Sequence, residues 1–320
     1  MDILCILNLV AGGGRVAPQV ASTIIKLCKR ANMSCDIVTT QKQGDGTLLA
    51  QKAARKGYRL VIAAGGDGTI NEVATGLVGT SCTLCIIPAG SGNGLARGLR
   101  IPLQPQEACR LIVHGAQKQI DVGQVGGRYF FATSGIGFDA HVGKVYNETP
   151  GHFRGLVPYA QIAIAEFFDY TPENVIVRCN GKTYYYTPVV LTVANTEQYG
   201  GGAIIAPGAV PDDGLFDISI IPQSPVFRIV NHLPKLFLGT INTFPNFIAH
   251  KAKSLTVTRN FPGPVHVDGE SFMAGKELEF TLLPRALNVQ VPKKFAQKSS
   301  SPPKGISEPD KQVEILKRVG

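Results

Sequence analysis

The residues with the clearest chemical meaning form the segment Gly-Gly-Asp-Gly-Thr at positions 65–69. An apolar run at 60–64 precedes this segment and a helix-like stretch at 70–77 follows it, so we predict a strand, a loop and a helix in that order. In an open α/β sheet, ligands bind at the carboxyl ends of the strands, where glycine main-chain N–H groups and a helix N-terminus attract phosphate oxygens. The segment therefore predicts a phosphate-binding loop, with nucleotide contacts at Gly65, Gly66, Gly68 and Thr69.

Asp67 is the acidic side chain of this loop. Phosphates would repel a lone carboxylate, so Asp67 indicates either a bound metal cation or a base beside the reacting hydroxyl. The plainer alternative is a glycine-rich turn in which the aspartate caps the following helix. The residue types alone leave both interpretations open.

Two further loops of small residues follow predicted strands in the same region. After the apolar run 84–87, residues 88–94 have the sequence Pro-Ala-Gly-Ser-Gly-Asn-Gly. The contacts expected in this loop are Ser91, Gly92 and Asn93. Asn8 ends the first predicted strand before the glycines at 12–14, although a simple turn cap explains Asn8 equally well. Several such loops at one sheet edge favour a phosphate cradle, and none ends in the Gly-Lys-Ser/Thr of a Walker A motif.

The elements that must hold these loops alternate along the first hundred residues. Short apolar runs alternate with stretches whose apolar residues have helical spacing, which is typical of a parallel sheet covered by helices. We expect strands at 3–8, 34–39, 60–64 and 84–87 and helices at 18–32, 48–56 and 70–77. This pattern predicts a doubly wound α/β nucleotide-binding domain at residues 1–118.

From about residue 119 the pattern changes to strand-like runs separated by glycine, proline and asparagine turns. We expect strands at 129–133, 175–179, 187–194, 216–221, 254–258 and 277–283, and one helix at 158–168. A mostly antiparallel β domain is therefore predicted at 119–294. Residues 295–320 contain little that could be buried, so we expect a flexible C-terminal tail.

Composition narrows the classes of function. The chain has 320 residues, 44% of them hydrophobic, which suits two packed domains. No apolar run reaches the roughly 18 residues that span a bilayer, so we expect a cytoplasmic protein. A net charge of +9 favours an anionic partner, and the lack of nucleic-acid-binding motifs argues against DNA or RNA. The seven cysteines indicate reduced core residues, with a redox or zinc role for Cys82 and Cys85 as the less favoured alternative.

These motifs resemble those of the diacylglycerol kinase catalytic family, which includes sphingosine and ceramide kinases and bacterial lipid kinases. The shared motifs are Asn8 with its glycines, Thr40 with Gly44 and Asp45, and the segments 65–69, 71–73, 88–97, 135–140, 207–217 and 268–270. The resemblance implies a phosphofructokinase-like nucleotide domain followed by an antiparallel β-sandwich, with ATP, Mg²⁺ and the lipid meeting between them. It implies an ATP-dependent lipid kinase that transfers the γ-phosphate to a hydroxyl of a diacylglycerol-type or sphingoid substrate.

The resemblance also suggests roles for individual residues. It implies that Asp67 belongs to the ATP–magnesium site and Thr40 to the nucleotide pocket. Asp268 and Glu270 would reach the same cleft from the second domain, and we favour Glu270 over Asp67 as the base that deprotonates the lipid hydroxyl.

Two more aspartates are expected to contact ligands. Asp139 stands where sphingosine-type kinases place a carboxylate near the lipid head group. Asp213 matches a motif tied to an aspartate–metal network, for which the alternative is a β-turn before a strand.

Residues 218–267 contain no Asp or Glu but include Arg228, Lys235, Lys251 and Lys253 among phenylalanines and leucines. This composition suits docking on an anionic membrane surface, and equally suits a buried layer of the β domain with solvated lysines. A homodimer is left open. The rival functions are an NAD kinase, which shares the Gly-Gly-Asp-Gly loop, and a non-catalytic lipid- or nucleotide-binding protein.

Overall fold

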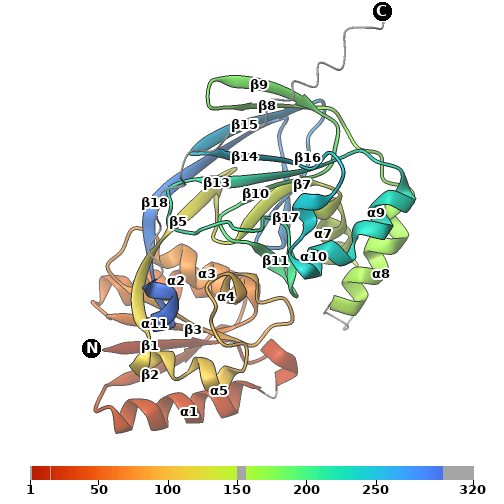
Figure 1. Cartoon of the computed structure of the whole chain (residues 1–320). Helices are drawn as coiled ribbons and strands as arrows, with labels where there is room; N and C mark the ends of the chain where they lie inside the picture. The colour runs from red at the N-terminus through yellow and green to blue at the C-terminus, as the bar shows by residue number, and fades with distance from the viewer. Residues whose placement is uncertain (1, 15, 150–155, 298–320) are drawn as a thin grey trace, which may run out of the picture.

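The first part of the chain is a parallel sheet covered by helices, as Figure 1 shows for the computed structural model, which describes residues 2–14, 16–149 and 156–297. The strands follow the order β2-β1-β3-β4. They are β1 (Ile3–Leu7), β2 (Cys35–Thr39), β3 (Leu60–Gly65) and β4 (Thr83–Pro88). The helices are η1 (Ala11–Gly14), α1 (Val16–Arg30), α2 (Asp45–Arg55), α3 (Asp67–Leu77), α4 (Gly94–Gly98), α5 (Pro105–Ala108) and α6 (Leu111–His114). Helix α1 lies on one face of the sheet, and α2 and α3 lie on the other.

The register of these strands brings the glycine loops to one edge. Leu7 of β1 is level with Thr39 of β2 and Ala64 of β3, and Gly65 is level with Pro88 of β4. Because parallel strands all point the same way, the residues that follow their carboxyl ends meet at this edge. The loops predicted from separate motifs are therefore neighbours in space.

The second part is a β-sandwich. One face is an antiparallel sheet in the order β14-β13-β10-β7-β16-β17. Its strands are β7 (Thr133–Gly137), β10 (Pro188–Ala194), β13 (Phe216–Pro222), β14 (Ile248–Ala252), β16 (Gly263–Val267) and β17 (Glu270–Ala274). The other face contains β5 (Ala116–Val125), β6 (Arg128–Phe130), β8 (Val175–Cys179), β9 (Lys182–Tyr186), β15 (Ser254–Arg259) and β18 (Glu277–Val291). Phe130, Phe216 and Phe280 are fully buried between the faces, with Phe130 and Phe216 stacked at 5.5 Å.

Short elements lie around the sandwich. They are α7 (Phe138–Glu148), α8 (Leu156–Phe167), the ribbon β11 (Gln198–Gly200) and β12 (Ala203–Ile204), α9 (Val226–His232), α10 (Pro234–Leu238), η2 (Ile241–Thr243) and α11 (Lys293–Ala296). No helix among the described residues is both long and apolar enough to cross a membrane.

The long strand β18 ties the two parts together. Its first half pairs with β15 and β5 in the sandwich, and its second half pairs in parallel with β4, where Val289 is level with Leu84. Leu287, Val289 and Val291 are fully buried in the core of the first part. The last strand therefore returns the chain to the sheet where it began, and one sheet extends through both parts.

The fold class predicted from the sequence is confirmed, including the α/β sheet followed by antiparallel β structure. The predicted run 129–133 was wrong as a single strand, because β6 ends at Phe130 and β7 begins at Thr133. The sequence did not predict helices α7, α9 and α10 or strand β17. Glycine motifs and short amphipathic segments give too little periodicity to indicate these elements. The predicted tail lies almost entirely outside the described residues.

The cysteines belong to the core, as the sequence predicted. All seven are free, and six are buried. Burial raises the pKa of the Cys82 and Cys85 thiols, so both remain protonated and unreactive at neutral pH. A redox or zinc role for this pair has no support in their surroundings.

Candidate active site

The first turn after β1 is joined to the glycine loop after β3. The side-chain amide of Asn8 donates a hydrogen bond to the Thr69 hydroxyl at 2.9 Å, and its oxygen accepts one from the Val10 main chain at 3.0 Å. Thr40 follows β2 at the same edge, where its main-chain N–H donates to the Leu7 carbonyl. The register therefore places Asn8, Thr40 and Thr69 at the carboxyl edge of the sheet, as predicted.

Asp67 links the two central loops. It is the first residue of α3, and its carboxylate oxygens accept hydrogen bonds from the main-chain N–H groups of Asn93 and Gly94, each at 2.8 Å. Asn93 closes its own loop by bonding both the N–H and the carbonyl of Gly90. Burial raises the pKa of Asp67, and the two N–H donors oppose that shift. Asp67 therefore caps the N-terminus of α4, which follows the neighbouring loop, and not the N-terminus of its own helix α3.

Glycines allow the chain segments of this edge to lie unusually close together. A Cβ atom at Gly90 would lie 2.8 Å from the Gly66 Cα, and one at Gly92 would lie 2.7 Å from an Asp67 carboxylate oxygen. A Cβ atom at Gly68 would lie 2.6 Å from the Glu270 carboxylate. Glu270 is the first residue of β17, so the second part of the chain reaches the first glycine loop there.

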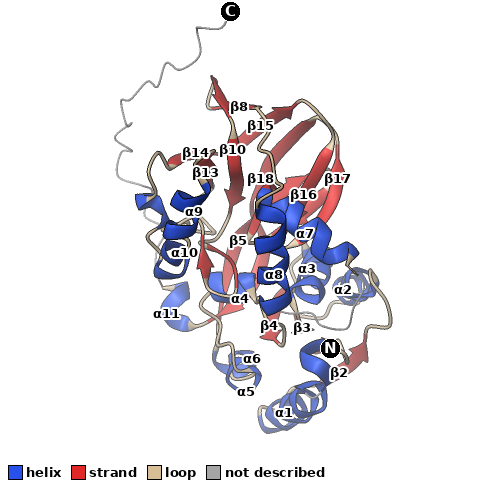
Figure 2. Cartoon of the chain, turned by 90° about the vertical axis from the view of Figure 1, so that its right-hand side faces the viewer, coloured by secondary structure: helices blue, strands red, loops and turns tan. Residues whose placement is uncertain are grey.

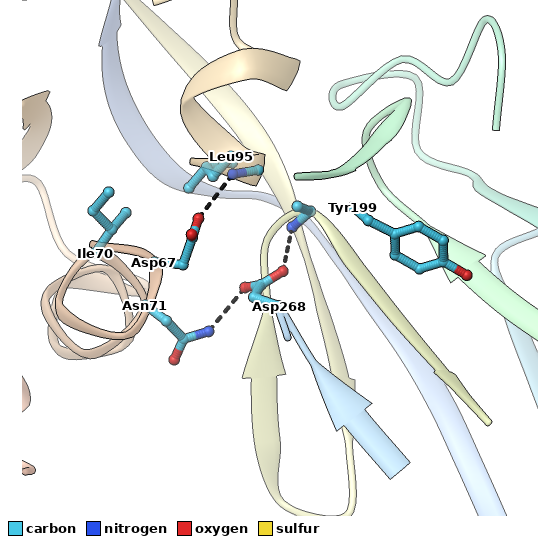
Figure 3. A pocket seen from close by; sticks show the side chains of 8 residues that line it. Asp67, Ile70, Asn71, Leu95, Tyr199 and Asp268 are labelled. Atoms are coloured by element: carbon cyan, nitrogen blue, oxygen red, sulfur yellow. Dashed lines mark hydrogen bonds between the residues drawn. The ribbon is translucent and has the colours of Figure 1, made fainter. Parts of the chain in front are cut away.

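Asp268 serves as an acceptor for a cluster of donors. Its carboxylate accepts main-chain hydrogen bonds from Phe131, Ala132 and Thr133 and a side-chain bond from Asn71, at 2.8–3.1 Å. Figure 3 shows the bond from Asn71. Burial raises its pKa, and the four donors oppose that shift. The geometry gives Asp268 the role of fixing the start of β7 against α3.

A small pocket lies where these elements meet (Figure 3). It is lined by Asp67, Ile70, Asn71, Gly94, Leu95, Ala132, Tyr199 and Asp268. Two predicted residues, Asp67 and Asp268, therefore share one pocket. The contributions of Asn71 and Tyr199 were not predicted, although Asn71 directly follows the glycine loop and the glycines at 200–202 indicate a tight turn beside Tyr199.

Asp139 lies in a buried polar network next to this pocket. One carboxylate oxygen accepts hydrogen bonds from the Tyr199 hydroxyl at 2.8 Å and the His266 Nε2 at 3.1 Å. The other accepts from the Ala140 main chain. A Cβ atom at Gly135 would lie 3.0 Å from both Asp139 and His266, which explains why the motif before α7 needs glycine. Burial raises the pKa of Tyr199 far above its usual value, so the phenol stays a neutral donor.

Other predicted residues have clear positions. Ser91 is exposed at the tip of the second loop, beside Gly92. The loop after Thr40 is held by Glu72, whose carboxylate accepts from the Gly44 and Gly46 N–H groups at 2.8 and 2.9 Å. This role of Glu72 was not predicted, because nothing in its spacing shows which loop it faces.

Asp213 belongs to a separate cluster and does not line the pocket. One of its carboxylate oxygens accepts from the Leu215 N–H, and the other lies 3.2 Å from the Lys251 ammonium. In the described part of the chain, no group of three or more His, Cys, Asp and Glu side chains is arranged to hold a metal ion. A protein-only metal cage is therefore absent from the described ranges.

The fold and the pocket define a two-part kinase, in which glycine loops at a sheet edge face carboxylates from a β-sandwich. Comparison with known families agrees. Residues 2–125 match the diacylglycerol kinase catalytic domain, and residues 132–291 match the YegS C-terminal NAD kinase beta sandwich-like domain. The chain belongs to the diacylglycerol kinase catalytic family, a family of lipid kinases with an alcohol acceptor.

Individual relatives cover nearly the whole chain. A Pseudomonas fluorescens protein named probable lipid kinase YegS-like is 28% identical over 89% of this chain and 94% of its own length. The Bacillus subtilis diacylglycerol kinase is 28% identical over 89% of this chain and 95% of its own length. Among solved structures, a candidate diacylglycerol kinase of Bacillus anthracis superposes with a TM-score of 0.77 at 26% identity, covering 92% of this chain and 96% of that chain.

A more distant neighbour shows the fold alone. The NAD kinase of Archaeoglobus fulgidus, solved in complex with ATP, has a TM-score of 0.53 at 12% identity and covers 92% of this chain and 96% of that chain. The sheet-edge architecture is therefore shared with kinases that act on other acceptors.

Replacing Asp268 by Asn tests its positioning role. We expect the free energy of unfolding to fall by about 2 kcal/mol, because an amide nitrogen would face buried main-chain N–H donors and leave one unpaired. Urea denaturation followed by circular dichroism measures this loss, with the exposed Asp169→Asn as the matched control. Equal midpoints for Asp268→Asn and wild type would contradict the role.

Proposed function

We propose that this chain transfers the γ-phosphate of ATP to the free hydroxyl of a diacylglycerol-type lipid. The observation that carries the proposal is the meeting of the two glycine loops with Glu270 at the carboxyl edge of the first sheet, where Asp67 lines the pocket and Glu270 lies next to Gly68. The loops supply main-chain N–H donors, and the N-terminus of α3 adds positive potential for phosphate. The second part of the chain supplies the Glu270 carboxylate, which lies next to Gly68 of the first loop.

The residues present fit a magnesium–nucleotide complex. Mg²⁺ is usually bound in kinases by one or two carboxylates together with phosphate oxygens and water, so a three-ligand protein cage is not required. Asp67 uses one hydrogen bond on each oxygen, which leaves lone pairs for a cation, and Glu270 lies next to the same loop. Asp67 would hold the cation, which would neutralise phosphate charge during transfer.

Glu270 is the better placed of the two candidate bases. Asp67 is assigned to the cation, and the Glu270 carboxylate reaches the first glycine loop from the β-sandwich, next to Gly68. In the reaction, the lipid hydroxyl oxygen forms a bond to the γ-phosphorus, its proton passes to Glu270, and the bond to the β-phosphate oxygen breaks to release ADP. Asp268 takes no proton in this scheme and keeps the pocket wall in place.

The Asp139 network favours a neutral glycerol head group over a sphingoid amine. A carboxylate that binds a lipid ammonium needs oxygen lone pairs directed at the cation. The Oδ2 atom of Asp139 already accepts from both Tyr199 and His266, its Oδ1 accepts from the Ala140 N–H, and only 12% of the side chain is exposed, so little of the carboxylate can face an ammonium. Tyr199 also lines the pocket beside Asp67, so the network shapes the acceptor side of the site.

An exposed apolar face suits docking on a membrane surface. Helices α8, α9 and α10 lie on the side that faces the viewer in Figure 2. The α9–α10 face exposes Val226, Phe227, Val230, Leu233, Phe237 and Leu238. Arg228 and Lys235 are the basic side chains of these helices, and no acidic residue occurs from 218 to 267. Apolar side chains beside basic ones favour binding to an anionic leaflet.

Lys251 is one of the basic residues for which the sequence left open both docking and a place in the β domain. Its ammonium is paired with Asp213 and Asp217. The docking proposal therefore rests on α9 and α10 and not on β14.

A substrate comparison tests the proposed reaction. With radiolabelled ATP and magnesium, we expect label in phosphatidic acid from diacylglycerol, at least about tenfold above that from sphingosine, because burial of an unpaired ammonium costs more than 1.4 kcal/mol. Ceramide and NAD are assayed in parallel. Label in NADP alone would support an NAD kinase, and no turnover with any acceptor would support a binding protein.

Replacing Glu270 by Gln tests the base. We expect kcat to fall by about 10²- to 10⁴-fold, the usual contribution of a positioned general base, with a smaller effect on the KM for ATP. The exposed Glu277→Gln on β18 is the matched control. Asp67→Asn is expected to raise the KM for magnesium–ATP as well, and a normal kcat in Glu270→Gln with a lost kcat in Asp67→Asn would transfer the role of base to Asp67.

Removing apolar side chains from the α9–α10 face tests docking. We expect Phe237→Ser with Leu238→Ser to weaken binding to anionic vesicles by about tenfold or more, because each exposed side chain contributes about 1–2 kcal/mol when buried in lipid. Vesicle sedimentation measures the binding. Tyr185→Ser is the matched control, since Tyr185 is 73% exposed but lies on β9. Unchanged sedimentation of the double variant would remove the α9–α10 face from the proposal.

A further inference from the structure

A cluster of carboxylates lies at the loop that leads into β13, apart from the pocket. Asp212 and Asp213 lie in this loop, and Asp217 is on β13 itself. Asp121 of β5 is fully buried behind the loop. Four carboxylates gathered in this way would repel one another unless positive groups or donors separate them.

Asp121 is satisfied by main-chain donors. Its two oxygens accept from the Gly214 and Arg285 N–H groups, each at 2.8 Å, and its own N–H donates to the Pro211 carbonyl at 2.7 Å. These bonds join the loop to β5 and to the bend of β18. The Gly214 and Arg285 N–H groups therefore stabilise the buried carboxylate of Asp121.

Lysines neutralise the other three carboxylates. Lys118 of β5 lies 2.7 Å from Asp212. Lys251 of β14 lies 3.2 Å from Asp213 and 2.9 Å from Asp217, and its side chain is 22% exposed. Burial alone would lower the pKa of Lys251, but the hydrogen bonds and charges of Asp217 and Asp213 outweigh it and raise the pKa. The ammonium is therefore charged at neutral pH.

The position of Lys251 conflicts with the expectation that Asp213 binds a metal. Both Asp213 oxygens are in use, one by the Leu215 N–H and the other by the Lys251 ammonium. A divalent cation between Asp213 and Asp217 would have to displace that ammonium, because both charges would occupy the same gap. The residues at this loop do not fit a metal ion.

We propose that the Lys251 ammonium is a built-in cation that takes the place of a metal ion at Asp213 and holds β13 to β14. An ammonium has three donors, and two of them bridge Asp213 and Asp217. The register agrees, since Asp217 and Lys251 are directly opposite each other in the β13–β14 pair. The loop keeps its structure without any bound divalent cation, and this holds whether or not the proposed kinase reaction is correct.

Metal binding without nucleotide tests the proposal. Manganese binding to wild type and to Asp213→Asn is measured by electron paramagnetic resonance, and thermal unfolding is measured with magnesium and with EDTA. We expect the same number of bound Mn²⁺ ions in both proteins and a wild-type midpoint that does not change with EDTA. One Mn²⁺ fewer in Asp213→Asn, or an EDTA-dependent fall in the wild-type midpoint that Asp213→Asn abolishes, would overturn the proposal.

Changing the lysine gives the converse test. We expect Lys251→Met to unfold at a lower temperature and to recover in part with Mg²⁺ or Mn²⁺, because Asp213 and Asp217 are then free to bind a cation. Recovery should vanish in Lys251→Met with Asp213→Asn, and Lys251→Arg should keep the wild-type midpoint. Lys253→Met, at an exposed neighbouring lysine, is the matched control. A wild-type midpoint in Lys251→Met, or the same loss in Lys253→Met, would contradict the proposal.

Discussion

The geometry of the site depends on the hydrogen bonds that the Asp268 carboxylate accepts. Three consecutive main-chain N–H groups at 131–133 and the Asn71 amide all donate to this one side chain. Asn71 lies on α3, the helix that begins with Asp67, whereas residues 131–133 lead into β7 of the sandwich. The carboxylate of this one half-buried residue therefore sets how the glycine loop of one part faces the strands of the other.

Close approach of main chains is the second constraint, and glycine alone permits it. A Cβ atom at Gly90 would lie 2.8 Å from the Gly66 main chain, and Cβ atoms at Gly92 and Gly68 would lie 2.7 and 2.6 Å from the ends of the Asp67 and Glu270 side chains. The segments so joined follow β3 and β4 or begin β17. Because the loops after β3 and β4 lie next to each other at this edge, both can act on one phosphate chain in the proposed reaction.

The carboxylates of the chain differ in the groups that donate to them or neutralise them. We use this difference to distinguish structural aspartates from the carboxylates assigned to the reaction. Asp121 and Asp268 face main-chain donors, and Asp213 and Asp217 face Lys251. Asp139 faces Tyr199 and His266. Asp67, which accepts from the Asn93 and Gly94 N–H groups, and Glu270 lie at the first glycine loop itself, which is why the proposed reaction is assigned to them. The pairing of Asp213 and Asp217 with Lys251 is the basis for proposing a lysine in place of the cation expected at Asp213.

The sequence by itself determined the class of the fold and the sheet edge at which the glycine loops lie. Strand, glycine loop and helix follow one another directly along the chain, at 60–77 and again at 83–98, so local periodicity and glycine placement were enough to predict the loops after β3 and β4. The motif order resembles that of the diacylglycerol kinase catalytic family. This resemblance added the expected kinase activity and the roles expected of the aspartates. The periodicity lies in neighbouring residues and the motif order lies along the chain, so neither signal depends on knowing which residues contact one another.

Only the tertiary structure decided what each aspartate does. Asp268 and Asn71 are 197 residues apart, and Lys251 reaches Asp213 across 38 residues, so no spacing in the chain shows that they meet. Whether a carboxylate is free for catalysis depends on which donors surround it after folding, and those donors are main-chain groups or lysines from distant strands. For that physical reason the sequence indicated which residues gather at the sheet edge, and only the packing of the sandwich against the first sheet showed which groups surround each aspartate.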